Sequence, residues 1–214
     1  MNKLFKTSFK TKIKQMKKMF FIAALAVFGM TSADAQVSFG VKAGPQLTNL
    51  IGDDADGIDS KVGFNVGGYA NIRFSEQLAF QPELQFSAQG GKFEGRDLGV
   101  DYKVKYNFSN INVPLMMKWY AYDGLNFEFG PQVGFNVAAK TDWDYDTPID
   151  GIDGSGKRDI EDAETVDFGL NIGAGYELPS GLNFGIRYTH GLTDVIKDVD
   201  VKHSVIALGV GYTF

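Results

Sequence analysis

The segment VDFGLNIGAGYE, residues 166–177, carries large apolar side chains at most even-numbered positions and small or polar side chains at the odd-numbered ones. An alternation with a period of two predicts a β-strand whose two faces differ in character. The same alternation occurs in LAFQPELQF (78–86), LNFEFGPQVGFNV (125–137) and VIALGVGYTF (205–214). The chain is therefore expected to consist of strands with one apolar face and one face of small or polar residues.

The lengths of the connections between strands give a second signal. The alternating patterns predict eight strands, at residues 37–49, 61–74, 78–88, 104–119, 125–138, 164–178, 182–191 and 201–214. The connections SEQ, YAYDG and PSG are tight turns, whereas the other four are long, and the longest covers residues 139–163. Up-and-down transmembrane barrels have short turns on the periplasmic side and long loops outside.

The character of the two faces decides which of them points inward. Eight strands enclose an interior only just wide enough for side chains, and many Phe and Leu residues would have to share it. With the faces reversed, small and polar residues fill the lumen and the aromatic residues contact lipid. Backbone groups in lipid are satisfied only when the sheet closes on itself. We therefore predict an all-β, eight-stranded, antiparallel, up-and-down transmembrane β-barrel; the alternative is a soluble periplasmic barrel with a lipid-binding apolar interior.

The N-terminus resembles an export signal. Lys17 and Lys18 precede the apolar run 19–30, and Ala33 and Ala35 supply the small residues that signal peptidase reads. The apolar run is too short to span a bilayer as a helix. We expect residues 1–35 to be cleaved, with Met16 as an alternative translation start, and residues 36–214 to form the barrel domain. The expected location is the outer membrane.

Composition excludes several kinds of function. The chain has no Cys and two His, which excludes disulfides and thiolate metal sites and disfavours a centre with several histidines. The first 35 residues contain seven of the 21 basic residues and one of the 26 acidic residues, so the exported part has a net charge of −11. Nucleic acid is an improbable partner for such a chain. No cofactor is expected.

Charged residues occur at the alternate strand positions whose side chains are predicted to point into the barrel, and they predict a network in the lumen. Its members are Lys42, Arg73, Glu83, Lys118, Glu128, Asp167, Glu177 and Arg187. Four charges of each sign in a narrow interior are expected to pair and to close the lumen, because an unpaired buried ion is strongly disfavoured. The alternative is a path for protons or small ions along the same charges.

The third long loop is acidic. Asp142, Asp144 and Asp146 alternate in a way that predicts a weak calcium site, since hard cations bind several carboxylate oxygens. The Gly and the terminal Glu of an EF-hand loop are absent from their places. The alternative is a soluble acidic loop, and divalent cations would then bridge it to phosphates of lipopolysaccharide.

A catalytic pair at the barrel rim is the remaining enzymatic possibility. His203 and Ser204 are neighbours, and neighbours on a strand point to opposite faces. His190 and Ser204 share the outward parity on adjacent strands, but no third group is evident to orient the histidine. We therefore predict no catalytic activity, and regard a lipid-modifying rim enzyme as the least favoured alternative.

Several segments, taken in order, resemble one family. FGVKAGPQLTNL, LAFQPELQFSAQGGKF, INVPLMMKWY, LNFEFGPQVGFNV, LNFGIRYTHGLTDV and VIALGVGYTF are similar to the PorT-type outer-membrane β-barrel family over residues 37–214. The chain departs from the usual Gly-x-Asn of the first strand, where Pro45 and Gln46 follow Gly44. The resemblance implies an integral outer-membrane protein and, for the founding member, a supporting role in secretion. It supplies no catalytic or ligand residues.

The predicted function is a structural or accessory role in the outer membrane, with a narrow solute or ion pore as an alternative. The expected partners are outer-membrane lipid and lipopolysaccharide, the barrel-assembly machinery, which in such families reads an aromatic C-terminal residue such as Phe214, and secretion components.

Overall fold

The fold is that of a closed ring of antiparallel strands. A computed structural model describes residues 36–97, 100–146 and 154–214, with the backbone alone at Asp97 and Asp146. The predicted export signal and the alternative start at Met16 lie outside the described residues. The strands of the described part are β1 (Gln36–Ile51), β2 (Asp59–Arg73), β3 (Leu78–Asp97), β4 (Val100–Tyr122), β5 (Leu125–Asp146), β6 (Gly154–Asp159), β7 (Val166–Glu177), β8 (Leu182–Gly191) and β9 (Lys202–Thr213).

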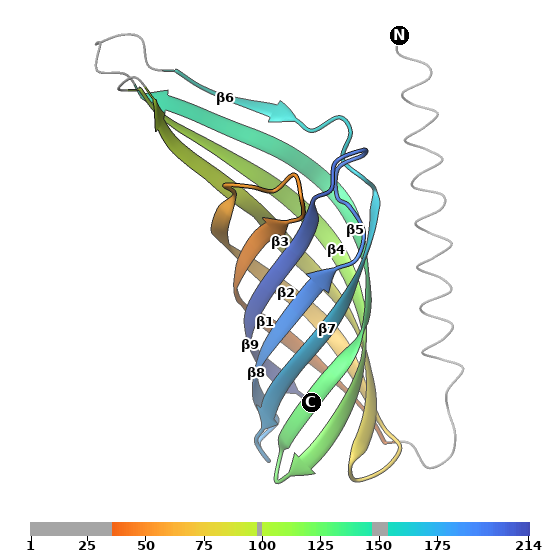
Figure 1. Cartoon of the computed structure of the whole chain (residues 1–214). Coiled ribbons are helices and arrows are strands. Elements are labelled where there is room, and N and C mark those ends of the chain that lie inside the picture. The colour runs from red at the N-terminus through yellow and green to blue at the C-terminus, as the bar shows by residue number, and fades with distance from the viewer. Residues whose placement is uncertain (1–35, 98–99, 147–153) are drawn as a thin grey trace. The chain divides into compact units, whose positions relative to one another are not determined.

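Eight of these strands form the ring, and Figure 1 shows their common tilt. Each pairs with its neighbours in the order β1, β2, β3, β4, β5, β7, β8 and β9, and β9 pairs with β1. The ninth strand, β6, pairs only with residues 140–145 of β5, outside the ring. The predicted eight-stranded, up-and-down barrel is confirmed, with one additional strand attached to it. Among the described residues, no helix is long and apolar enough to span a membrane.

The two faces of the ring have the predicted character. Large apolar side chains are exposed on the outside, such as Phe129 and Ile172, each 63 % exposed. Buried polar side chains fill the inside, among them Gln46, Gln85, Asn112 and Gln132. The apolar face therefore forms no interior, which contradicts the alternative of a soluble barrel that holds lipid.

The closure between β1 and β9 depends on one close approach. The pairing runs from Gly40 opposite Thr213 to Ile51 opposite Lys202 and is interrupted at Gly44 and Pro45. A Cβ atom at Gly44 would overlap the carbonyl oxygen of Leu208. A residue without a side chain is therefore required where the two strands meet.

The short turns and long loops lie at opposite ends of the barrel. The three short turns are at the end that also holds the C-terminus (Figure 1). The tightest of them is formed by Asp123 and Gly124, whose φ angles of 38° and 83° suit a two-residue hairpin turn. This end is called the short-turn end and the other the long-loop end.

Three strands extend farther at the long-loop end than the sequence predicted. We expected strands to end near residues 88 and 138 and to start near 104, but β3 continues to Asp97, β4 starts at Val100 and β5 continues to Asp146. The strand β6 lies within the segment 139–163 that we expected to be loop. In the extended parts of β3, β4 and β5, aromatic residues alternate with charged residues instead of with small ones. The period of two therefore persists, although the two faces no longer differ in hydrophobicity as they do elsewhere.

An apolar cluster lies at the long-loop end. Leu50, Ala55, Phe108, Val195 and Val201 are buried together, and they come from strands and from the β1–β2 and β8–β9 loops. The two loops are joined because the backbone N–H of Asp200 donates a hydrogen bond of 2.9 Å to Oδ2 of Asp54. This cluster is called the apolar cap.

Candidate functional site

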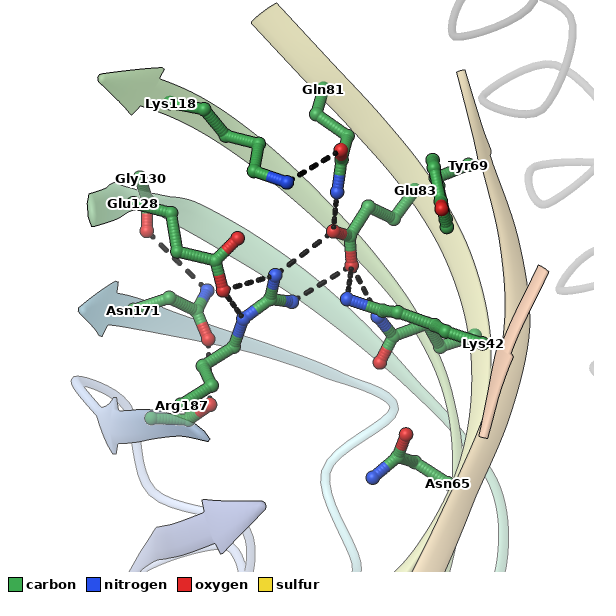
Figure 2. Close-up of polar contacts among 12 residues, drawn as sticks. Lys42, Asn65, Tyr69, Gln81, Glu83, Lys118, Glu128, Gly130, Asn171 and Arg187 are labelled. Atoms are coloured by element: carbon green, nitrogen blue, oxygen red, sulfur yellow. Dashed lines mark hydrogen bonds and ion pairs between the residues drawn. The ribbon is translucent and has the colours of Figure 1, made fainter. Parts of the chain in front are cut away.

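The centre of the lumen is a buried carboxylate. Glu83 on β3 accepts hydrogen bonds of 2.8 and 2.9 Å from the two terminal nitrogens of Arg187 on β8 (Figure 2). Nζ of Lys42 on β1 lies 2.6 Å from the same carboxylate. The period of two places all three side chains on the inward face of their strands. Glu83 is thus held by two cations.

A second carboxylate completes the group. Nε of Arg187 donates a hydrogen bond of 2.7 Å to Oε1 of Glu128 on β5. The side-chain amides of Gln81 and Gln85 donate to Glu83. The set Lys42, Glu83, Glu128 and Arg187, called the central cluster, is electrically neutral and its members are hydrogen-bonded to one another. Buried charges require such pairing and satisfaction.

Among the described residues, the other predicted lumen charges form no ion pair with the central cluster. Towards the short-turn end, Arg73 lies 3.7 Å from Glu177 and stacks 3.9 Å above the ring of Tyr120. The hydroxyl of Tyr120 donates a hydrogen bond of 3.0 Å to Glu177. Lys118 donates to Oε1 of Gln81 at 3.3 Å and, among the described residues, has no carboxylate as an ion-pair partner.

Asp167 lies in a polar group below the apolar cap. Nδ2 of Asn110 is 3.5 Å from Oδ2 of Asp167 and 3.4 Å from Nε2 of His203. The ring of His203 packs edge-on against Phe108 of the cap, with 5.1 Å between centroids. Within the described part of the chain, Asp167 has no basic ion-pair partner. His203 was not among the predicted lumen residues, although its position on β9, next to the outward-facing Ser204, already places its side chain inside.

The structure therefore brings four of the eight predicted charges into one cluster and two more into a separate pair. It leaves Lys118 and Asp167 outside both groups. The amides that surround the charges, such as Gln81, Gln85 and Asn110, were not predicted from the sequence. They occupy the same alternate, inward-facing strand positions as the predicted charges, and this feature of the sequence could have identified them.

A small polar cavity adjoins the central cluster. Its volume is about 70 Å³, and its lining includes Lys42, Gln46, Gln85, Asn112 and Gln132. The side-chain oxygens of Asn112 and Asn126, two of its lining residues, are buried and accept no hydrogen bond from any residue that the structure describes. A volume of this size holds a few water molecules, which would satisfy these oxygens.

At the barrel rim, the possible catalytic residues are not joined directly. The hydroxyl of Ser204 lies 3.4 Å from that of Tyr188, and the Tyr188 hydroxyl lies 3.3 Å from Nδ1 of His190. A tyrosine hydroxyl thus stands between the serine and the histidine. A nucleophilic serine requires its base within hydrogen-bond reach.

The predicted calcium site is described only in part. Asp142 lies 3.3 Å from Nζ of Lys157 on β6, and the side chain of Asp146 is outside the described residues. Among the described residues, no group of three His, Asp or Glu side chains is placed to hold a metal ion. A calcium site at Asp142, Asp144 and Asp146 stays a prediction.

Comparisons with known proteins identify the family. A sequence model described as "Outer membrane protein beta-barrel domain" matches residues 30–197, more than three quarters of the chain. No curated protein matches this chain in a comparison of sequences. Among solved structures, it is similar to Neisserial surface protein A, with 15 % identity, a TM-score of 0.48 and coverage of 84 % of this chain and 99 % of that one.

Two further structures are similar at the same level. Ail, the attachment invasion locus protein of Yersinia pestis, has 17 % identity and a TM-score of 0.45, with 84 % of this chain and 99 % of that chain covered. The outer membrane protein OprG of Pseudomonas aeruginosa has 13 % identity and a TM-score of 0.40, with 83 % and 95 % covered.

Proposed function

Because this chain belongs to the family of outer membrane protein β-barrel domains, which implies a place in the outer membrane, we propose that it is a closed, non-conducting barrel. Its role is structural or accessory, and it has no catalytic activity. The observation that carries the proposal is that charged and apolar side chains obstruct the lumen at two levels.

The first obstruction is the central cluster. Its four side chains come from β1, β3, β5 and β8, which are every second strand of the ring. They meet in the middle of the lumen and bind one another rather than lining a path along the wall (Figure 2). An ion that passes would have to break contacts that compensate buried charges, and such contacts are costly to break.

The second obstruction is the apolar cap. Phe108 and Leu50 are 1 % and 2 % exposed, and Val195 and Val201 from the β8–β9 loop are 2 % exposed. An ion or a polar solute gains no hydrogen bond from such residues and loses its hydration. The cap therefore opposes passage at the long-loop end, independently of the charges below it.

A narrow pore for small solutes or ions is the second candidate. It is favoured by the polar cavity of about 70 Å³ beside the central cluster. Electrical recording separates the two candidates. Purified protein, shown to be folded by its heat-dependent mobility on a detergent gel, is added to planar lipid bilayers. We expect no channel current from the wild type, and regular current steps would refute the closed barrel.

A variant tests whether these two levels are the closures. Arg187→Ala is combined with replacement of residues 194–199 by Gly and Ser, which removes Val195 from the cap. Current is expected from this combined variant, and less or none from either change alone. Current of equal size from all three proteins would show that the obstructions lie elsewhere.

The accessory role follows from the resemblance to the PorT-type family and extends to secretion across the outer membrane. In this proposal the barrel acts beside secretion components and is exported by residues 1–35. Deletion of the gene is expected to lower the amount of secreted protein in the medium while the outer membrane stays intact. An unchanged set of secreted proteins would refute the secretion role and leave the closed barrel standing.

A further inference from the structure

Beyond the ring, four strands continue as a projecting sheet at the long-loop end (Figure 1). It consists of residues 93–97 of β3, 100–106 of β4, 140–146 of β5, and β6, and is called the outer sheet. Residues that pair directly across antiparallel strands point to the same side. The pairings Phe93–Val104–Trp143–Gly156 and Gly95–Tyr102–Tyr145–Gly154 therefore lie on one face.

On that face, aromatic rings pack over glycine residues of the neighbouring strands. A Cβ atom at Gly95 would overlap the ring of Tyr102, one at Gly154 would overlap Tyr145, and one at Gly156 would overlap Trp143. Each ring thus lies against the backbone of the neighbouring strand rather than standing up from the sheet. Rings in this position present a π-face, rather than an edge, to whatever approaches.

Two of the rings form a flat, exposed surface. The ring planes of Trp143 and Tyr145 are inclined by only 6°, with 5.7 Å between centroids. Trp143 is 40 % exposed and Tyr145 is 37 % exposed. Farther in, the β1–β2 loop packs against Phe93, since a Cβ atom at Gly57 would lie 2.9 Å from its ring. The pair Trp143 and Tyr145, called the aromatic platform, is therefore the accessible part of this face.

The charge beside the platform is positive. Arg158 pairs with Thr141, one step along the same face from the Trp143–Gly156 pair, and it is exposed. Among the side chains that the structure describes on this face, Arg158 alone is charged. On the opposite face, Asp142 pairs with Lys157, Glu94 with Lys103 and Asp101 with Arg96. Next to the aromatic platform there is thus a cation, Arg158, for which the described part of the chain provides no carboxylate partner.

We propose that the aromatic platform and Arg158 bind a saccharide that carries a carboxylate or phosphate group. The apolar C–H face of a sugar ring stacks on the electron-rich face of Trp143 or Tyr145. The guanidinium of Arg158 donates paired hydrogen bonds to the anionic group, a geometry that arginine favours.

The site lies outside the barrel, so the inference goes beyond the proposed function and does not depend on it. A protein that binds saccharide and also conducts ions would refute the closed barrel alone. A silent protein that binds no saccharide would refute the present proposal alone.

The test is a binding measurement on the folded mature chain in detergent. The probes are an immobilised panel of uronic-acid, sialic-acid and phosphorylated oligosaccharides, together with their neutral counterparts. We expect wild-type protein to bind members of the acidic set and to bind their neutral counterparts about tenfold more weakly, as loss of a charged hydrogen bond predicts. Absence of binding across the panel would overturn the proposal.

Matched variants locate the site. Arg158→Gln is expected to remove the preference for acidic saccharides, whereas Lys157→Gln, the next residue on the opposite face, is expected to retain it. Trp143→Ala is expected to abolish binding, whereas Tyr122→Ala, an exposed aromatic residue at the short-turn end, is not. Equal effects of the members of either pair would overturn the assignment.

A fluorescence measurement covers the case in which Trp143→Ala fails to fold. The chain has two tryptophans, so Trp119→Phe leaves Trp143 as the only indole emitter. Addition of a bound acidic oligosaccharide is expected to shift or quench this emission. Unchanged emission in the presence of bound saccharide would place the saccharide elsewhere. Self-association that depends on Trp143, without saccharide binding, would assign the face to a second copy of the chain.

Discussion

Arg187 on β8 binds both carboxylate oxygens of Glu83 on β3, and these two strands lie opposite each other in the ring. Three strands separate them in either direction around the barrel. Lys42 on β1 and Glu128 on β5, the other two members of the central cluster, also come from opposite strands. The Glu83–Arg187 contact therefore braces the barrel across one diameter, and Lys42 and Glu128 are joined to each other through it.

Arg187→Gln tests this brace. The substitution leaves the buried carboxylates of Glu83 and Glu128 with less compensation, and breaking a buried ion pair in this way lowers the free energy of unfolding by about 3 kcal/mol. Urea titration of the barrel in lipid vesicles, followed by gel mobility, measures the change. Lys157→Gln, whose side chain is 75 % exposed, is the control and is expected to leave stability unchanged. Equal stability of the two variants would contradict a bracing role.

Ile172→Arg tests which surface contacts lipid. Ile172 lies near the middle of β7 and is 63 % exposed on the outer face. An arginine near the middle of the bilayer costs about 2–4 kcal/mol, and one near the interface about 0–1 kcal/mol. Val62→Arg, at a residue near the long-loop end that is 73 % exposed, is the matched control and should have the smaller effect. The free energies of folding into lipid vesicles are compared. A larger effect at Val62 would mean that Ile172 does not lie nearer the middle of the bilayer than Val62.

Gly44→Ala tests the closure between the first and last strands. The new methyl group would meet the carbonyl oxygen of Leu208, which is backbone and cannot rotate away. Such overpacking typically costs about 1–3 kcal/mol. Gly68→Ala is the control, because its nearest neighbour, the carbonyl oxygen of Gly40, would be 3.5 Å away. We expect the heat-dependent mobility shift to begin at a lower temperature for Gly44→Ala only.

Asp200 provides a test in the loops that form the apolar cap. The hydrogen bond from the Lys202 ammonium lowers the pKa of the Asp200 carboxyl below its ordinary value. The folded pKa is thus below the unfolded one, so the contribution to stability is complete above the unfolded pKa and is lost as the pH falls through the folded pKa. Because the backbone of Asp53 in the β1–β2 loop also hydrogen-bonds this carboxylate, acid is expected to loosen the contact between the two cap loops.

The measurement is an NMR titration of the Asp200 carboxyl carbon in detergent micelles. Lys202→Gln is expected to raise the pKa of Asp200 towards its ordinary value, because the hydrogen bond and the charge are both removed. Lys197→Gln changes a lysine in the same loop that does not bind Asp200, and the pKa should stay low. A pKa that is unchanged in Lys202→Gln would mean that another group holds it down.

Most of the fold could be predicted from the sequence because side chains alternate between the two faces of each strand. Residues such as Phe129 and Ile172 lie outside as expected, because a period of two assigns every side chain of a strand at once. The outer sheet was missed because its alternation is between aromatic and charged residues, as in Tyr102 and Lys103. A search for apolar residues alone interprets that pattern as a loop.

Parity was less informative about the site. It placed Glu83 and Arg187 inside but could not show that they meet, because that depends on the stagger of strands around the ring. It also gave no reason to separate Asp167 from the central cluster. The platform of Trp143 and Tyr145 depends on pairing with β6, whose sequence GSGKRD has little strand propensity of its own.

The pairing of β1 with β9 also has a consequence for how the protein is made. The first strand to leave the ribosome can complete its hydrogen bonds only with the last, and the N–H of the terminal residue, Phe214, donates to the carbonyl oxygen of Phe39. A chain cut short before β9 would retain two open edges, on β1 and β8. Such edges cannot be buried in hydrocarbon at tolerable cost. The bilayer should therefore admit only chains that already contain β9, and so select against products of interrupted translation.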